Sequence, residues 1–480
     1  MIQGTGSDVG KTLVVAALCR AAQRRGINVA PFKSQNMSNN AASCPGGGEI
    51  GRAQALQAHA AGIELSVDFN PVLLKPETDE CSQIILQGKP AGRIESCEFL
   101  SERERWWPAI DDSFMSLCEK YELVIIEGAG SAAEVNLRSG DVANMGFSER
   151  FNVPVCLVAD IDRGGVIASI VGTNNILDLR DAKRIVGYII NKFRGDVTLF
   201  NPAICRIKQE TNWNCFGVIP WTSAAYLLPS EDTIVQSQPR TTAQPLIKIA
   251  APMLSRIANF DDADPLRLEP SVDFMFVPPG KPIPQDADVI LLFGTKSTVA
   301  EMTFIRNQGW DHDIISHARH GGRILGICGG YQLLGETITD AIGVDGVTGS
   351  YAGLGLLSVQ TKMNSTKVAE PFNGQCALTS SKVRGYEIHV GETKGVDASR
   401  PMLMINGRAE GARSISGKIE GTYVHGLLAN HEYRREWLER ATLQNIDSIN
   451  YKESVNNALE KLTDVVEKAL DVDYLLDQAQ

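Results

Sequence analysis

The stretch "MIQGTGSDVGKT" (residues 1–12) opens the chain and sets the fold expected of its first part. Its glycines, Gly4, Gly6 and Gly10, precede Lys11 and Thr12, and an apolar helical run follows. Such a loop between a strand and a helix surrounds a phosphate with backbone N–H groups, while the lysine neutralises the terminal phosphates. The strict P-loop spacing is not met, because the first glycine stands one position early, at Gly4. The alternative is a glycine-rich turn that binds nothing.

The phosphate interpretation predicts the nucleotide-binding residues. We expect ATP to bind at Gly6, Val9, Gly10, Lys11 and Thr12, with the Thr12 hydroxyl facing Mg²⁺.

Two acidic residues are candidates for further Mg²⁺ ligands. Glu127 ends the apolar run "VIIEGAG", and a carboxylate at the end of a buried strand could approach the ion. Taken alone, Glu127 would more simply be a carboxylate exposed at a strand end, but the glycine loop favours the metal interpretation. Glu49 is the second candidate.

The composition restricts the class of protein. A chain of 480 residues predicts two or three domains. The net charge of −11 argues against a general nucleic-acid binder. The ten cysteines form no C-x-x-C pair, which is typical of free thiols in a reducing cytosol. No segment reaches the roughly 18 apolar residues of a membrane span, so we expect a cytoplasmic protein without a membrane partner.

Alternating strands and helices predict an α/β fold. Buried apolar runs such as "VPVCLVADID" and "IVGYIINKF" alternate with helical patterns, as in parallel sheets covered on both faces. A stretch rich in Pro, Ser, Thr and Gln predicts a linker at residues 229–245, after which a second strand series begins. We therefore predict two doubly wound, mainly parallel-sheet domains at residues 1–228 and 246–435. A helical C-terminal tail is expected at residues 436–480.

Cys328 is the candidate nucleophile of the second domain. In "GRILGICGGYQLLG" it stands between glycines, after an apolar strand and before a helix. A tight strand-to-helix turn exposes such a side chain and leaves the next backbone N–H free to stabilise an oxyanion. The alternative is a small buried cysteine, which is the expected state of the other nine. A thiol nucleophile needs a base, and among the seven histidines the sequence context leaves His389 and His425.

Ten sequence blocks in order along the chain resemble one known family. They include "QGTGSDVGKT", "PFKSQNMSNN", "IEGAGSAAEVNL", "ADIDRGG", "NKFRGD", "GICGGYQLLG" and "GTYVHG". Together they resemble the cobyric acid synthase family (CobB/CobQ type). There a dethiobiotin synthetase-like P-loop domain is fused to a class I glutamine amidotransferase domain.

The resemblance implies a reaction and its substrates. Glutamine would release ammonia through a Cys328 thioester, and ATP would activate a carboxylate as an acyl phosphate. The acceptor would be adenosylcobyrinic acid a,c-diamide, amidated at its b, d, e and g carboxylates in cobalamin biosynthesis. The resemblance also selects His425 as the base and suggests Gly294 and Gly329 for the oxyanion hole. The H-x-E motif of many amidotransferases is absent, because Leu427 occupies its third position. A backbone carbonyl or another carboxylate would then orient His425.

Five residues are candidates for holding the acidic substrate or the transferring phosphoryl group. They are Lys33, Gln35, Asn36, Arg163 and Arg194, which follow predicted strand ends, where ligands bind in open α/β sheets. The alternatives are a solvent-facing Lys33 and structural roles for the two arginines beside neighbouring aspartates.

Two other functions compete with this interpretation. Cobyrinic acid a,c-diamide synthase shares both domain types, but the "FKSQNMS" and "FRGD" blocks argue against it. A P-loop switch protein of the partition type would have no use for Cys328. The sequence gives no indication of the oligomeric state.

Overall fold

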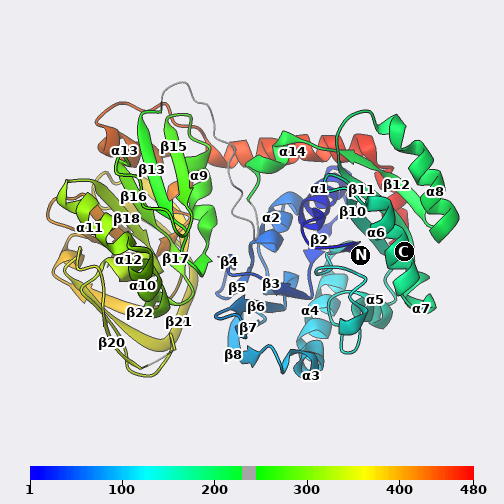
Figure 1. Ribbon diagram of the computed structural model, residues 1–480, viewed down its shortest axis with the longest axis horizontal. Helices are drawn as coiled ribbons and strands as arrows, with labels where there is room; N and C mark the ends of the chain where they lie inside the picture. Colours follow the sequence, from blue (N-terminus) through cyan, green and yellow to red (C-terminus); the bar gives the residue numbers. More distant parts are fainter. Residues whose placement is uncertain (230–244, 347, 480) are drawn as a thin grey trace. The chain divides into compact units, whose positions relative to one another are not determined.

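The computed structural model describes residues 1–229, 245–346 and 348–479 (Figure 1). They fall into two compact units, each described by itself. Unit 1 comprises Met1–Ser38, Glu49–Pro229 and Val455–Gln480, and unit 2 comprises Asn39–Gly48 and Ser230–Ser454. Almost all of the linker predicted at residues 229–245 lies outside the described residues.

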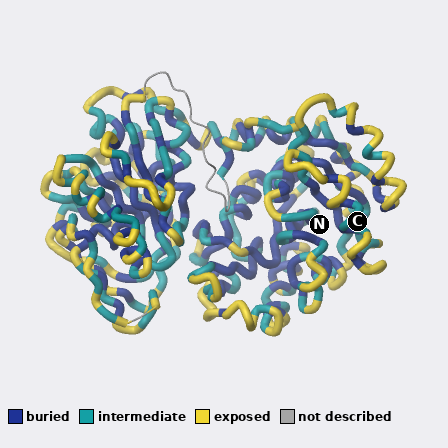
Figure 2. Tube along the Cα trace, in the orientation of Figure 1, coloured by how far each residue is buried: buried dark blue, intermediate teal, exposed yellow. Residues whose placement is uncertain are grey.

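Unit 1 is built on a parallel sheet of short buried strands. The order β1-β10-β11-β12 continues into the pair β2-β9 through a parallel bridge between Ile2 and Glu127. The strands carry apolar runs because both faces of the sheet are covered, and most of their residues are buried (Figure 2). They are β1 (Ile2–Gly4), β2 (Val29–Phe32), β9 (Leu123–Ile126), β10 (Val155–Asp160), β11 (Ile185–Phe193) and β12 (Asn214–Pro220).

Helices connect these strands, and a smaller sheet adjoins them. The sequence analysis did not predict the smaller sheet, in which β6-β7-β8 is antiparallel and β3 pairs with β6 in parallel. Its strands are β3 (Gln35–Met37), β6 (Val72–Pro76), β7 (Cys81–Leu86) and β8 (Lys89–Glu95). The main helices are α1 (Lys11–Arg24), α2 (Arg52–Ala61), α4 (Trp107–Lys120), α5 (Met145–Phe151), α6 (Val166–Ile176) and α8 (Asn201–Thr211).

The end of the chain completes unit 1. Most of α14 (Tyr451–Ala469) and all of α15 (Val472–Asp477) belong to this unit. Arg24 of α1 forms ion pairs with Glu460, Asp464 and Glu467 of α14. A helix encoded after the second domain therefore covers the helix that follows the glycine loop.

Unit 2 contains a six-stranded sheet of order β15-β13-β16-β18-β26-β25, parallel except for β25. The sheet carries the elements around Cys328, since β18 leads into α12 (Gly329–Leu334) and β26 continues toward His425. The strands are β13 (Ile247–Pro252), β15 (Val272–Val277), β16 (Val289–Leu292), β18 (Arg323–Ile327), β25 (Ala412–Arg413) and β26 (Ile419–Thr422).

A second, mostly antiparallel sheet of seven strands completes unit 2. Its centre is the long pair β21 (Val359–Cys376) and β22 (Lys382–Gly395), and β27 (Val424–His425) adds to β22. Helix α13 (His431–Thr442) follows. The predicted fold class, two mainly parallel α/β units with helices near the C-terminus, is confirmed. Among the described residues, no helix combines the length and apolar character needed to cross a membrane.

Candidate active sites

The glycine loop of unit 1 lies between β1 and α1, as its sequence predicts. The Lys11 ammonium donates to the carbonyls of Gly6, at 3.0 Å, and Gly130, at 2.8 Å. Lys11 is only 8% exposed, so it is less open to solvent than the loop sequence suggests. A β-carbon at Gly4 would lie 2.8 Å from the Gly6 carbonyl oxygen and 2.9 Å from the Lys11 Nζ, so the backbone of the loop leaves room only for glycine there.

Glu127 is the centre of a buried polar cluster beside the loop. Its Oε1 accepts hydrogen bonds from the Thr12 hydroxyl, at 2.8 Å, and from the Lys33 ammonium, at 3.1 Å. Its Oε2 accepts one from the Gln57 amide. Glu127 is 1% and Lys33 5% exposed, so the alternative of a solvent-facing lysine is wrong.

This cluster has the chemistry that a magnesium–nucleotide complex requires. Mg²⁺ typically takes one or two protein carboxylates and completes its shell with phosphate oxygens and water. The Thr12 hydroxyl and the Glu127 carboxylate fit that need. Glu49 instead pairs with Lys75, with 2.8 Å between its Oε2 and the Lys75 Nζ. Within the described residues, no group of three or more His, Cys, Asp or Glu side chains is arranged to hold a metal ion.

Three residues that the sequence analysis missed support the site. Gln57 of α2 holds Glu127, as described above. Asn191 at the end of β11 donates to the Val9 carbonyl, at 2.8 Å, and the Lys192 ammonium donates to the Asp8 carbonyl, at 2.6 Å. The polar dipeptide Asn-Lys near the end of an apolar strand was the available signal for the last two.

The substrate candidates occupy different environments. Gln35 and Asn36 are buried, and Asn36 donates to the Gln54 amide oxygen. Arg163 and Arg194 are exposed and each lies beside an aspartate: Arg194 donates to Asp162 at 2.7 Å, and Arg163 lies 3.6 Å from Asp8.

The Arg194 guanidinium also lies over the Trp221 ring, with 4.2 Å between the guanidinium carbon and the ring centroid. The hydrogen bond to Asp162 raises the pKa of Arg194 above the ordinary arginine value. Arg194 thus has a partner that the alternative interpretation names, whereas Arg163 lies beside Asp8 rather than a neighbouring aspartate, and the exposure of both arginines leaves them open to a ligand.

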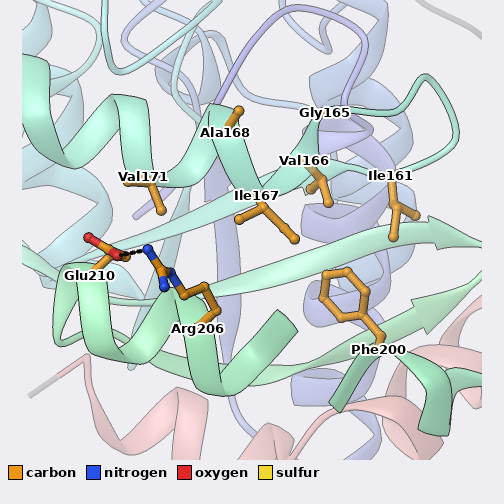
Figure 3. A pocket seen from close by; sticks show the side chains of 9 residues that line it. All are labelled: Ile161, Gly165, Val166, Ile167, Ala168, Val171, Phe200, Arg206 and Glu210. Atoms are coloured by element: carbon orange, nitrogen blue, oxygen red, sulfur yellow. Dashed lines mark ion pairs between the residues drawn. The ribbon is translucent and has the colours of Figure 1, made fainter. Parts of the chain in front are cut away.

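An apolar groove begins near the loop that carries Arg163 (Figure 3). It encloses about 690 Å³ and lies between α6 and the segment around Phe200 and α8. Ile161, which follows β10 directly, lines one end, and the ion pair between Arg206 and Glu210 lines the other. The carboxyl end of β10 therefore offers an apolar surface next to a loop that carries the exposed Arg163.

Cys328 of unit 2 occupies a strained turn between β18 and α12. Its backbone has φ +54° and ψ −111°, a left-handed conformation that is costly for any residue except glycine. Its N–H donates to the Thr422 carbonyl at 2.7 Å, and its thiol lies 3.4 Å from the Ile388 carbonyl. The strain is the one expected of a nucleophile elbow.

His425 is held beside this turn by an aspartate. Its Nδ1 lies 2.7 Å from the Oδ2 of Asp262, and the other oxygen of Asp262 accepts the Gly426 N–H. Both side chains are buried, with 1% and 2% exposure. The group that orients His425, left open by the sequence, is thus the Asp262 carboxylate. Only the acidic run "DDAD" (residues 261–264) marked it.

Electrostatics favour a charged His425. Burial opposes the imidazolium, but the Asp262 carboxylate, together with Cys328, outweighs it and raises the pKa of His425 to about 10. This raised pKa suits the imidazole to accept the thiol proton of Cys328 and to remain protonated beside a thiolate. The Tyr386 ring stacks on His425, with 5.3 Å between ring centroids.

The two candidate oxyanion glycines border the nucleophile. A β-carbon at Gly294 would lie 3.5 Å from the Cys328 Cβ and 3.3 Å from the His425 Cε1. One at Gly329 would lie 2.6 Å from the Thr295 Cγ2. Strand β17 (Gly294–Thr295) thus passes directly beside the turn that carries Cys328.

His389, the other histidine that the residues alone allowed, has a different surrounding. Its ring stacks on Tyr423, with 3.9 Å between centroids, and its Nε2 lies 3.8 Å from Glu387. The buried aspartate partner belongs to His425.

Comparisons with known proteins identify the family of each domain. The model of the CobQ/CobB/MinD/ParA nucleotide binding domain matches residues 1–235, and that of the CobB/CobQ-like glutamine amidotransferase domain matches residues 248–433.

Proteins described as cobyric acid synthase are similar over nearly the whole length. The Hyphomonas neptunium protein is 57% identical over 98% of this chain and 96% of its own. The Allorhizobium ampelinum protein is 51% identical over 99% and 98%, and the Rhizobium meliloti protein 50% identical over 100% and 98%. A P-loop nucleotide-binding domain and a glutamine amidotransferase domain make this chain an ATP-using, glutamine-dependent ligase, and it belongs to the cobyric acid synthase family.

Proposed function

We propose that the chain amidates the b, d, e and g carboxylates of adenosylcobyrinic acid a,c-diamide, giving adenosylcobyric acid in the cytoplasm. Each step would use one ATP and one glutamine. The observation that carries this proposal is the 57% identity, over 98% of the chain, to a protein described as cobyric acid synthase.

Unit 2 is proposed to release ammonia from glutamine. The Cys328 thiolate attacks the side-chain amide carbon, while the N–H groups of Gly329 and Gly294 receive the developing oxyanion. His425, held by Asp262, takes the thiol proton and passes it to the departing ammonia. Water then hydrolyses the thioester and yields glutamate. The left-handed turn at Cys328 and the 2.7 Å contact between His425 and Asp262 support these roles.

Unit 1 is proposed to activate the carboxylate. The backbone of Gly6, Val9 and Gly10 cradles the nucleotide phosphates, and Lys11 neutralises them. Thr12 and Glu127 would hold Mg²⁺, with Glu49 as a further candidate, and the ion would neutralise phosphate charge when bound. Lys33, fixed by Glu127, stabilises the transferring phosphoryl group.

The acidic corrinoid is proposed to bind beside the carboxyl ends of β10 and β11. Gln35, Asn36, Arg163 and Arg194 would contact its carboxylates, since an arginine can donate two hydrogen bonds to a carboxylate at once. The apolar groove that begins at Ile161 supports this placement, because the macrocycle has large apolar faces.

Mass spectrometry of the corrinoid tests the proposal. The purified chain is incubated with ATP, Mg²⁺, glutamine and the a,c-diamide, and four successive amidations are expected. A product without added amides would contradict the proposed reaction. A Lys11→Ala variant should lose amidation with either glutamine or ammonium chloride as nitrogen source, while its glutamine hydrolysis persists.

A further inference from the structure

The acid that orients His425 lies on a very short element. Asp262 belongs to η6 (Phe260–Ala263), a single 3₁₀ turn, which forms few internal hydrogen bonds and depends on its neighbours for its position. The Asp262 N–H donates to the Asn259 carbonyl at 3.2 Å. Asn259 therefore begins the turn that places the aspartate beside His425.

Asn259 also follows the strand that faces the oxyanion glycine. Strand β14 (Ile257–Ala258) pairs with β17, with Ala258 opposite Gly294. Asn259 then adopts φ +52° and ψ +43°, and this left-handed residue turns the chain from β14 into η6. One residue thus joins the strand beside Gly294 to the turn that carries Asp262.

A distant segment of the sequence holds Asn259. The Asn259 side-chain oxygen accepts the N–H of Ala41 at 2.9 Å, and both residues are buried, at 3% and 0% exposure. Ala41 belongs to residues 39–48, which form part of unit 2 although the neighbouring residues on both sides belong to unit 1. A β-carbon at Gly47 of this segment would lie 3.7 Å from the Ala369 carbonyl of β21, so the segment contacts unit 2 at a second point.

We propose that Asn259 is a positioning residue of the glutaminase site and that residues 39–48 hold it through the Ala41 N–H. This inference rests on the proposed glutaminase role of unit 2. A lost or shifted segment would release η6 and β14 together, so that Asp262 would move away from His425 and Gly294, paired with β14, would move away from Cys328. Glutamine hydrolysis would then depend on a piece of chain that directly follows the motif containing Lys33, Gln35 and Asn36.

The first test separates the hydrogen bond from the backbone conformation. Asn259→Gly keeps the left-handed turn but removes the acceptor, whereas Asn259→Asp keeps both. In the full chain, we expect Asn259→Gly to lower the kcat of glutamine hydrolysis by about tenfold or more, as the loss of one buried hydrogen bond predicts. Its KM should change little, its ammonium-driven amidation should persist, and Asn259→Asp should recover most of the rate.

The second test acts on the other partner of the bond. Ala41→Pro has no N–H to donate, while its control Ala41→Gly retains one. Ala41→Pro should reproduce the loss seen in Asn259→Gly, and the double variant should be no slower than either single variant. Additive losses, or a wild-type kcat in Asn259→Gly, would overturn the proposal.

A third measurement does not require turnover. The alkylation rate of Cys328 by iodoacetamide reports the thiolate that His425 stabilises, and it should fall in Asn259→Gly but not in Asn259→Asp. An unchanged rate in Asn259→Gly would overturn the positioning role. If the wild-type chain hydrolysed no glutamine, the proposed function would fail, while this comparison would still decide the role of Asn259.

Discussion

At the scale of single residues, the proposed nucleophile and its proposed base are specialised in different ways. Cys328 depends on backbone geometry, because its left-handed turn projects the thiol and places it before the first N–H groups of α12. His425 depends on charge, because the buried Asp262 carboxylate offsets the cost of burying an imidazolium. The sequence could reveal the first, since glycines flank Cys328. It could not identify Asp262, which lies 163 positions before His425 in the sequence and meets it only in the folded chain.

Replacing the nucleophile should separate the two half-reactions. Cys328→Ala should lower glutamine-dependent amidation by about 10³-fold or more, because no thioester can form. Amidation driven by high ammonium chloride should continue near the wild-type rate. The expectation that the other nine cysteines are buried is wrong for Cys97, Cys118 and Cys205, which are exposed. Cys205 therefore provides the control, and Cys205→Ala should leave both rates unchanged. Equal loss of both reactions in Cys328→Ala would place this cysteine in the synthetase site or in the fold.

Removing the charge of Asp262 should slow hydrolysis without unfolding the protein. In Asp262→Asn the neutral amide can no longer stabilise the imidazolium, so kcat for glutamine hydrolysis should fall by about 10²–10⁴-fold. Steady-state kinetics measure this loss, and ammonium-driven amidation serves as the internal control. A wild-type kcat would exclude Asp262 from the mechanism.

The same pair should make the stability of unit 2 depend on pH. The folded pKa of His425, about 10, lies above the ordinary value of 6.5, so the folded state holds a proton that the unfolded state releases first. The stabilisation is complete below about pH 6.5 and is lost as the pH rises toward 10. Urea unfolding of wild type and Asp262→Asn should therefore show a difference in unfolding free energy that shrinks across this range. A difference that grows with pH would contradict the assigned charge state.

At the scale of elements, the sequence predicted those that carry continuous apolar runs. Strands such as β10, β11 and β18 are buried on both faces, and their Val- and Ile-rich runs identify them in the sequence. The long pair β21 and β22 was missed because its residues alternate between buried and exposed, which leaves no apolar run. The small sheet of β3, β6, β7 and β8 was not predicted for a related reason, because β8 is almost wholly exposed and carries no apolar run.

Close packing at the elbow gives an element-scale prediction. A β-carbon at Gly330 of α12 would lie 2.1 Å from the Leu292 carbonyl of β16, so Gly330→Ala must push α12 away from the sheet. We expect a loss of about 1–3 kcal/mol in the unfolding free energy of unit 2, together with lower glutaminase activity. Gly172→Ala in α6 is the control, because nothing lies within 4 Å of its added β-carbon. That variant should gain about 0.4–1 kcal/mol. Denaturant titration measures both changes.

At the scale of the whole molecule, each compact unit is built from segments that are not contiguous in the sequence. The amphipathic pattern of α14 predicted a helix, yet periodicity alone does not identify the surface that a helix covers. In the structure this helix buries its apolar side in unit 1, next to the helix that starts at the glycine loop. The sequence pattern also could not predict that residues 39–48 belong to unit 2, since this depends on partners more than 200 positions away.

The apolar side of α14, more than its ion pairs, should stabilise unit 1. Leu459 is 0% exposed, so Leu459→Ala should cost about 2–5 kcal/mol. Glu460→Ala removes ion pairs to Arg20 and Arg24 that are partly open to solvent, and should cost about 1 kcal/mol or less. With increasing urea, ammonium-driven amidation should fail earlier in Leu459→Ala than in wild type, while glutamine hydrolysis should fail at the same concentration. Loss of both activities together would mean that α14 stabilises unit 2 as well.

The return of α14 to the first unit also has a consequence during translation. A ribosome has synthesised residues 1–229 long before it reaches Val455, the first residue of the segment that completes this unit. At about 5–20 residues per second, the apolar surface that α14 will cover stays open for some tens of seconds on the nascent chain. Nascent chains paused in this interval should bind chaperones that recognise exposed apolar surface. A gene divided at the linker would leave both products incomplete, one without its closing helix and the other without residues 39–48.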